Sequence, residues 1–138
     1  MPVPSGRFLK DLETLPKIFG QDFYFSPEAA RQAILHQSCF NVIHSDSLIK
    51  IDFMIRKREE YRLVEFERRQ RIQVQGRPLW IVSKEDLILS KLEWARHSQS
   101  QRQLADVENL LATGADMEYL QTWSRKLNLT AMLTRVSP

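Results

Sequence analysis

The sequence has a single cysteine, Cys39, and only four glycines in 138 residues. One cysteine cannot form an internal disulfide, so we expect the protein to reside in a reducing compartment, the cytoplasm. No apolar run approaches the roughly 18 residues of a membrane span, and no stretch has the features of a signal peptide. No internal repeat, P-loop or glycine-rich dinucleotide turn is found either. These absences exclude a membrane span, a disulfide scaffold and a repeat array.

The composition is that of a folded chain. Apolar residues make up 43% of it, with three Trp and seven Phe. A chain of this length buries a sizeable core without disulfides or metals, and we expect a single domain. The net charge of +3 and the pI of about 9.2 are mildly basic. They are compatible with a nucleotide partner but do not require one, and nucleic acid is not the expected partner.

The segment 48–55 reads as a strand with one apolar and one mixed face. Its apolar residues alternate with polar or flexible ones, and Asp52 is its only carboxylate. Two interpretations of Asp52 stay open. It faces solvent on the outer side of the sheet, or it binds a positive partner such as a metal, a lysine or an arginine.

The other segments predict an α+β fold, with a small mixed or antiparallel sheet flanked by helices. We expect two hairpins, 40–55 and 72–82, and helices at 5–15, 27–36, 83–95, 104–111, 117–127 and 130–136. Pro16 is expected to end or bend the first helix. The single predicted domain, 1–138, then has a loose arm at 1–4, a sheet-containing part at 5–82 and a helical part at 83–138. The charged run 57–71 reads as a solvated face of weak ion pairs.

Two helical residues stand out. Ser83 and Asp86 form a capping box in which Asp86 is expected to reach back to the serine amide. Lys91, further along that helix, lies inside the apolar arc. Its ammonium either emerges at the edge of the sheet or is directed across the edge of the core at a carboxylate or phosphate. Asp106 borders the apolar face of the next helix.

Four segments together resemble a known family. They are Ile51-Asp52-Phe53, the run from Trp80 to Leu92, the Arg102-x-x-x-Asp106-Val107 motif, and Asp116-x-x-Tyr119-Leu120-x-x-Trp123. In these segments the chain resembles prokaryotic minimal nucleotidyltransferase-like proteins, relatives of the abortive-infection toxin nucleotidyltransferases. The resemblance extends from about residue 23 to residue 123. It implies that Asp52 corresponds to the third metal-binding carboxylate and that Lys91 and Asp106 correspond to the lysine and aspartate motifs that follow it, with all three as catalytic residues. We also expect Lys50 and Lys91 to be the nucleotide-binding residues.

The chain departs from that family at one motif. The family has a glycine-serine turn after its first strand and an Asp-x-Asp pair on the next strand, whereas this sequence contains no Asp-x-Asp. Nucleotidyl transfer uses two or three carboxylates to hold paired metal ions. The metal site at Asp52 is therefore incomplete, and we expect a shortened or degenerate domain that is catalytically silent by itself. No cofactor is expected to bind, and Mg only if another chain completes the site.

Three functional hypotheses follow. The first is an interaction or regulatory module, in a toxin–antitoxin-like setting, whose exposed sheet edge is covered by a homo-oligomer or a protein partner. The second is an active nucleotidyltransferase whose missing motif is supplied by another chain, or by residues encoded upstream of a wrongly assigned start codon. The third is a nucleotide- or nucleic-acid-binding module that uses Lys50, Lys91 and the arginines of 68–71.

Overall fold

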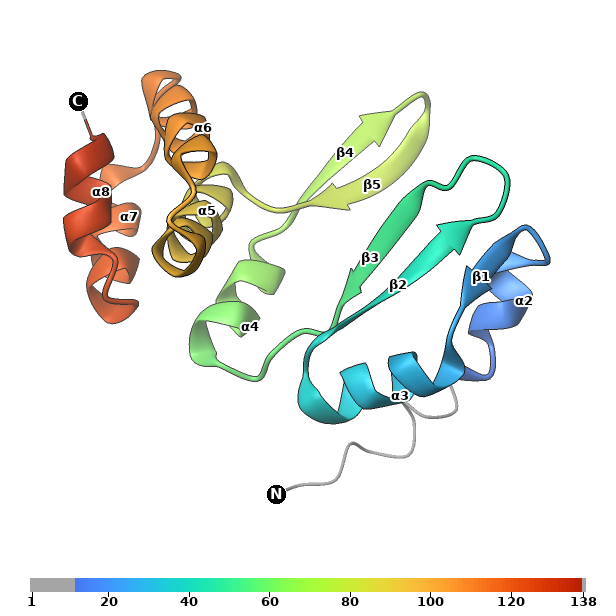
Figure 1. Cartoon of the computed structure of the whole chain (residues 1–138). Coiled ribbons are helices and arrows are strands. Elements are labelled where there is room, and N and C mark those ends of the chain that lie inside the picture. Colours follow the sequence, from blue (N-terminus) through green and yellow to red (C-terminus); the bar gives the residue numbers. More distant parts are fainter. Residues whose placement is uncertain (1–11, 138) are drawn as a thin grey trace. The chain divides into compact units, whose positions relative to one another are not determined.

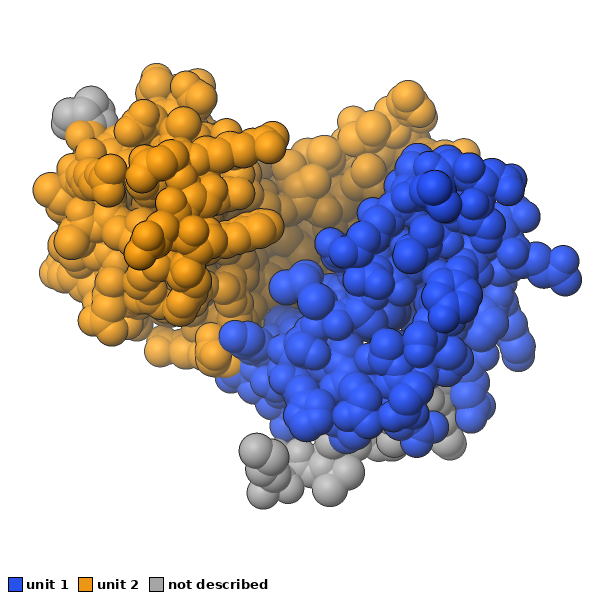
Figure 2. Space-filling view, in the orientation of Figure 1, with its two compact units in different colours: residues 1–58 blue, residues 59–138 orange. Residues whose placement is uncertain are grey.

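The computed structural model describes residues 12–137 and divides the chain into two compact units, residues 1–58 and residues 59–138 (Figure 2). Each unit has its own hydrophobic core. The predicted α+β class is confirmed, because helices are combined with two small antiparallel sheets. Within the described residues, no helix is both long and apolar enough to cross a bilayer. The prediction of a single domain stays a prediction.

In its described part, the first unit combines a three-stranded antiparallel sheet with helices α2 and α3 (Figure 1). Its strand order is β1-β2-β3. The elements in chain order are α2 (Leu15–Phe19), β1 (Phe23–Phe25), α3 (Pro27–His36), β2 (Cys39–His44) and β3 (Lys50–Met54). The hairpin predicted over 40–55 is therefore confirmed as β2 and β3.

Local sequence sets the helix boundaries of this unit. The Ser26 hydroxyl accepts the amide hydrogen of Ala29 at 3.2 Å, and Pro27 occupies the first turn of α3, as the cap signal predicts. Pro16 was expected to end or bend the first helix. It stands instead in the first turn of α2 and so begins a helix there. The helix predicted over 5–15 lies mostly outside the described residues.

One face of the sheet carries the core of the first unit. Phe40 and Val42 are buried with Ala30 and Ala33 of α3. Phe40 stands opposite Phe53 in the β2–β3 register, and their rings stack with centroids 5.1 Å apart. Successive side chains along a strand point to opposite faces of the sheet, so the residues that alternate with these core residues lie on the other face, which is mostly exposed.

The second unit combines helices with a two-stranded hairpin (Figure 1). Its elements in chain order are α4 (Glu60–Glu67), β4 (Gln70–Val74), β5 (Arg77–Ile81), α5 (Lys84–Ser98), α6 (Gln101–Ala112), α7 (Met117–Lys126) and α8 (Thr130–Val136). The second hairpin and the later helices are confirmed. The expectation of a merely solvated run at 57–71 is wrong in part, because α4 forms there and buries Tyr61.

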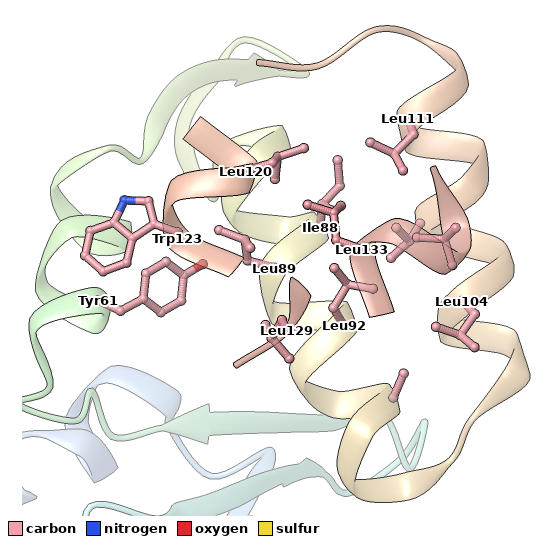
Figure 3. Close-up of a cluster of buried hydrophobic side chains, with 13 residues drawn as sticks. Tyr61, Ile88, Leu89, Leu92, Leu104, Leu111, Leu120, Trp123, Leu129 and Leu133 are labelled. Carbon is pink, nitrogen blue, oxygen red and sulfur yellow. The ribbon is translucent and has the colours of Figure 1, made fainter. Parts of the chain in front are cut away.

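The helices of this unit share one core (Figure 3). The largest fully buried apolar side chains are Ile88, Leu89 and Leu92 of α5, together with Val107, Leu120 and Leu129. Tyr61 of α4 joins them, with its ring centroid 5.2 Å from that of Trp123. This core fixes α5 as the central helix, and the polar side chains of α5 are positioned by it.

Two helix ends and one hairpin turn use residues in the left-handed backbone conformation, and most of these residues are glutamines. Gln37 ends α3 with a φ of 49°, and Gln99 ends α5 with a φ of 53°. The β4–β5 turn consists of Gln75 and Gly76, both with positive φ, which is the type of two-residue turn that matches the twist of a hairpin.

Candidate functional site

Asp52 lies on the exposed outer face of the β2–β3 hairpin. Its Oδ1 is 3.3 Å from the Lys50 ammonium and 3.5 Å from the Asn41 side-chain nitrogen, which donates to it. Asn41 is its directly opposed neighbour on β2. The structure therefore brings the two candidates Asp52 and Lys50 together, with both side chains 56% exposed.

This donor set does not fit a paired-metal site. Asp52 is the residue that supplies a carboxylate to this face of the sheet. The charged group beside it is the ammonium of Lys50, which is a cation. A divalent ion needs several oxygen ligands, and a neighbouring ammonium opposes its binding. Within residues 12–137, no cluster of three His, Cys, Asp or Glu side chains is placed to hold a metal. No catalytic step through a metal is derived for this chain.

Lys91 and Asp106 meet between α5 and α6 in the second unit. The Lys91 ammonium donates to Asp106 Oδ2 at 2.7 Å and to Gln103 Oε1 at 3.0 Å. The lysine is mostly covered, with its side chain 21% exposed, whereas that of Asp106 is 41% exposed. The hydrogen bond from Lys91 is the main reason that the pKa of Asp106 lies below its ordinary value. The ammonium is thus directed at a carboxylate, and this is one of the two interpretations that the sequence left open.

A buried polar cluster around Asp86 was not predicted from the sequence. The Asp86 carboxylate is fully buried and accepts hydrogen bonds from Ser83 Oγ at 2.6 Å, the Tyr119 hydroxyl at 2.6 Å and Arg68 Nε at 3.1 Å. Ser83 Oγ accepts the Asp86 amide hydrogen at 3.2 Å, so half of the predicted capping box forms. The other half is wrong, because the Asp86 carboxylate binds the serine hydroxyl and two distant side chains.

The Asp86 cluster perturbs two tyrosines. Burial, reinforced by the negative charges of Asp86 and Glu65, raises the pKa of Tyr61 well above its ordinary value. Burial also raises the pKa of Tyr119, and its hydrogen bond to Asp86 adds to this effect. The Tyr119 hydroxyl donates to the Asp86 carboxylate, whereas the Tyr61 hydroxyl donates to the Asp86 main-chain carbonyl at 3.3 Å. Both phenols therefore hold their protons more tightly than a free tyrosine does.

A second polar network joins α4 to α5. The Arg62 guanidinium donates to Glu65 at 2.8 Å and to Ser90 Oγ at 3.1 Å, and it also contacts Glu93. Ser90 Oγ in turn donates to the second oxygen of Glu65 at 2.8 Å. Arg62 alone faces two carboxylates, and Arg96, 4.0 Å from Glu93, supplies a second cation at the border of the network. These contacts between α4 and α5 indicate that the network holds the two helices together.

The arginines of 68–71 divide between internal contacts and solvent. Arg68 bonds to Asp86 and lies over the Tyr119 ring, 3.9 Å from its centroid. Arg69 lies over the Trp80 ring at 4.7 Å, and Arg71, on β4, is exposed. A common ligand-binding role for these arginines is therefore not supported by their positions.

A depression between α7 and α8 has a volume of about 460 Å³. Three of its four hydroxyl groups donate to helix carbonyls three or four residues earlier, those of Ser124, Thr134 and Ser137. Arg125 is the charged residue of the lining, and its Nε donates to Gln121 O. This arrangement serves the helices and offers little to a ligand.

The predicted site residues thus form two pairs. Lys50 and Asp52 belong to the first unit, and Lys91 and Asp106 belong to the second. Their assignment as catalytic or nucleotide-binding residues stays a prediction. Comparisons with protein-family models, with curated proteins and with solved structures give no match for this chain.

Proposed function

We propose that the chain is a non-catalytic protein-interaction module with a nucleotidyltransferase-like sequence, and that it acts in the cytoplasm. The observation that carries this proposal is the exposure of the β4–β5 hairpin. Every residue of β5 is exposed, and four of the five residues of β4 are exposed as well.

The register of the hairpin gathers its aliphatic residues on one face. Ile72 stands opposite Leu79, and Val74 and Ile81 lie on the same face because they are two positions away. Val74, Leu79 and Ile81 are each more than 40% exposed. We call these four residues the aliphatic face. An isolated two-stranded sheet is marginally stable in water and gains stability when another element covers its apolar face.

The edge strand β3 supports the same proposal. It pairs with β2 on one side only; Ile49, the residue before β3, and Met54, its last residue, are 62% and 77% exposed. An edge of this kind readily pairs with or packs against another chain. A homo-oligomer and a different protein partner both fit this surface.

The proposal is tested by photo-cross-linking in cells. A benzophenone amino acid replaces Leu79 on the aliphatic face, and in a control variant it replaces Leu35, an exposed leucine of α3. We expect a discrete covalent adduct from position 79 and none from position 35. An adduct with a second copy or with another protein supports the proposal. Failure of position 79 to form any adduct rejects it.

A second candidate function is supported by the two ion pairs. Lys50 with Asp52 and Lys91 with Asp106 are the residues that the family resemblance assigns to nucleotide binding and catalysis. In this candidate another chain supplies the missing carboxylates and the chain acts as part of a nucleotidyltransferase. Calorimetric titration of Mg with ATP, GTP, CTP and UTP tests it, with Asp52→Ala as the control. Binding that requires both Mg and Asp52 favours this candidate, and no binding at millimolar nucleotide removes it.

A further inference from the structure

Pro78 identifies which edge of the β4–β5 hairpin is open. Pro78 has no N–H and stands opposite Gln73. Opposed pairs in an antiparallel ladder alternate between pairs that exchange two hydrogen bonds and pairs that exchange none. The Gln73 and Pro78 pair is therefore of the non-bonded kind, and so is the pair of Arg71 and Trp80 two positions along.

The backbone groups of non-bonded pairs point away from the partner strand. On β5 they belong to Pro78 and Trp80, and Pro78 offers no donor, so this edge is blunted. On β4 they belong to Arg71 and Gln73, which both have a donor and an acceptor, and both residues are exposed. We call these outward groups the β4 edge. It presents an uninterrupted row of donors and acceptors to an incoming strand.

The charge around this edge is of one sign. The segment 69–81 contains Arg69, Arg71 and Arg77 and has no Asp or Glu. Arg71 and Trp80 are directly opposed, and the Arg69 guanidinium lies over the same Trp80 ring. Within the described residues neither Arg71 nor Arg77 forms an ion pair. Arg77 stands opposite Val74 and so lies at the end of the aliphatic face. The other face of the hairpin carries Arg71 and the exposed Trp80 ring, with the Arg69 guanidinium over that ring, and we call it the basic face.

We propose that the β4 edge binds an extended acidic segment of another protein, which adds to the hairpin as a third strand. The acidic side chains of this segment lie beside Arg71 on the basic face, and its alternate apolar side chains extend the aliphatic face beside Ile72 and Val74. A second copy of the chain is disfavoured at this edge, since each copy brings Arg69 and Arg71 and no acid to the contact. The inference rests on the proposed interaction function and names its partner.

The test uses a fluorescein-labelled nine-residue peptide of alternating valine and glutamate, titrated with the full chain and followed by anisotropy. Two control peptides replace the glutamates by lysine or the central valine by proline. We expect the acidic peptide to bind at micromolar concentrations and each control to bind at least about tenfold more weakly. Binding should weaken as salt rises from about 0.05 to 0.5 M.

Two substitutions in the chain act on separate features of the site. Arg71→Glu reverses the charge, and Gln73→Pro removes an outward N–H while leaving the hairpin bonds in place, as Pro78 does on β5. We expect each to weaken peptide binding at least about tenfold. Arg125→Glu, on α7, is the matched control and should bind as the wild type does. Circular dichroism and a melting temperature within about 4 °C of the wild type confirm that each variant is folded.

The possible failures are distinguishable. Lack of peptide binding up to millimolar chain, equal binding of the lysine peptide, or wild-type binding by Gln73→Pro each overturns the strand-addition inference. A homodimer seen by light scattering and abolished by Gln73→Pro also overturns it, since the partner is then a second copy. If the cross-link at position 79 forms while the peptide does not bind, the interaction function stands without this inference. Failure of both experiments removes both proposals.

Discussion

The ammonium of Lys91 lies 2.7 Å from Asp106 Oδ2, and this contact joins α5 to α6 from inside the apolar arc of α5. The stem of the lysine is covered and its charge emerges at the border of the core, where a carboxylate meets it. The pair of Lys91 and Asp106 therefore has a structural role, which is to join α5 to α6, and this role does not depend on a catalytic function.

This pair predicts an acid-dependent stability. The pKa of Asp106 is lowered in the folded chain, so its contribution is present above the ordinary carboxyl pKa and is lost as the pH falls through the folded pKa. We expect Lys91→Met to lower the melting temperature by a few degrees at pH 7 and by much less at pH 3. Asp106→Asn should behave in the same way, and the double variant should lose less than the sum of the two. Equal losses at both pH values would contradict this assignment.

The Asp86 cluster predicts a large loss of stability. Asp86→Ala leaves the hydroxyls of Ser83 and Tyr119 and the guanidinium of Arg68 without their buried acceptor. The free energy of unfolding should fall by about 3–5 kcal/mol. Chemical denaturation measures it. Glu118→Ala, an exposed acidic residue of α7, serves as the control and should change it by less than about 0.5 kcal/mol.

The buried tyrosines predict instability at alkaline pH. A raised pKa means that the folded chain holds the phenol proton more tightly than the unfolded chain does, so the stabilisation is present below pH 10 and declines above it. We expect the denaturation midpoint to fall steeply between about pH 10 and 12. Tyr119→Phe should flatten this decline, although it lowers stability at pH 7 by about 1–3 kcal/mol. An unchanged slope in Tyr119→Phe would show that Tyr119 is not responsible.

Asp52 is expected to matter little for folding. Its side chain is 56% exposed and its contacts, with Lys50 and Asn41, lie on the solvent face of the sheet. Asp52→Ala should change the free energy of unfolding by less than about 0.5 kcal/mol. A loss above about 2 kcal/mol in urea denaturation would mean that this face is covered in solution. The variant is therefore a clean control for the nucleotide titration, because a loss of binding would not reflect unfolding.

Local signals in the sequence predicted much of the secondary structure. The Ser26-Pro27 start of α3, both hairpins and the helices after residue 83 depend on caps, alternation and glycine-containing turns, which act over a few residues. The α4 helix was missed because its charged residues conceal the apolar spacing of Tyr61 and Val64, which pack on the core.

The burial of Asp86 could not be predicted in this way. In sequence it reads as an ordinary acidic residue in a first helical turn. Its environment is created by Arg68, 18 positions before it, and by Tyr119, 33 positions after it. The exposure of both faces of the β4–β5 hairpin is equally non-local, since alternation predicts that one face is covered without saying by what. The position of Lys91 inside its apolar arc predicted a carboxylate or phosphate partner as one of two interpretations, but nothing in the sequence identified Asp106 as that partner, because the two residues are 15 positions apart and on different helices.

The non-glycine residues in left-handed conformation have a practical consequence for all of these experiments. Gln37 and Gln99 end their helices with positive φ, a conformation that costs an L-residue about 1 kcal/mol and that glycine adopts freely. Gln37→Gly and Gln99→Gly relieve this strain, less the greater freedom that glycine has in the unfolded chain. The relief of strain and the cost of glycine's freedom, about 0.5–1 kcal/mol, nearly cancel, so these substitutions should change the free energy of unfolding little. Gln37 and Gln99 take no part in the hairpin or in the Asp86 cluster, and they are therefore helix ends at which a substitution leaves both features in place.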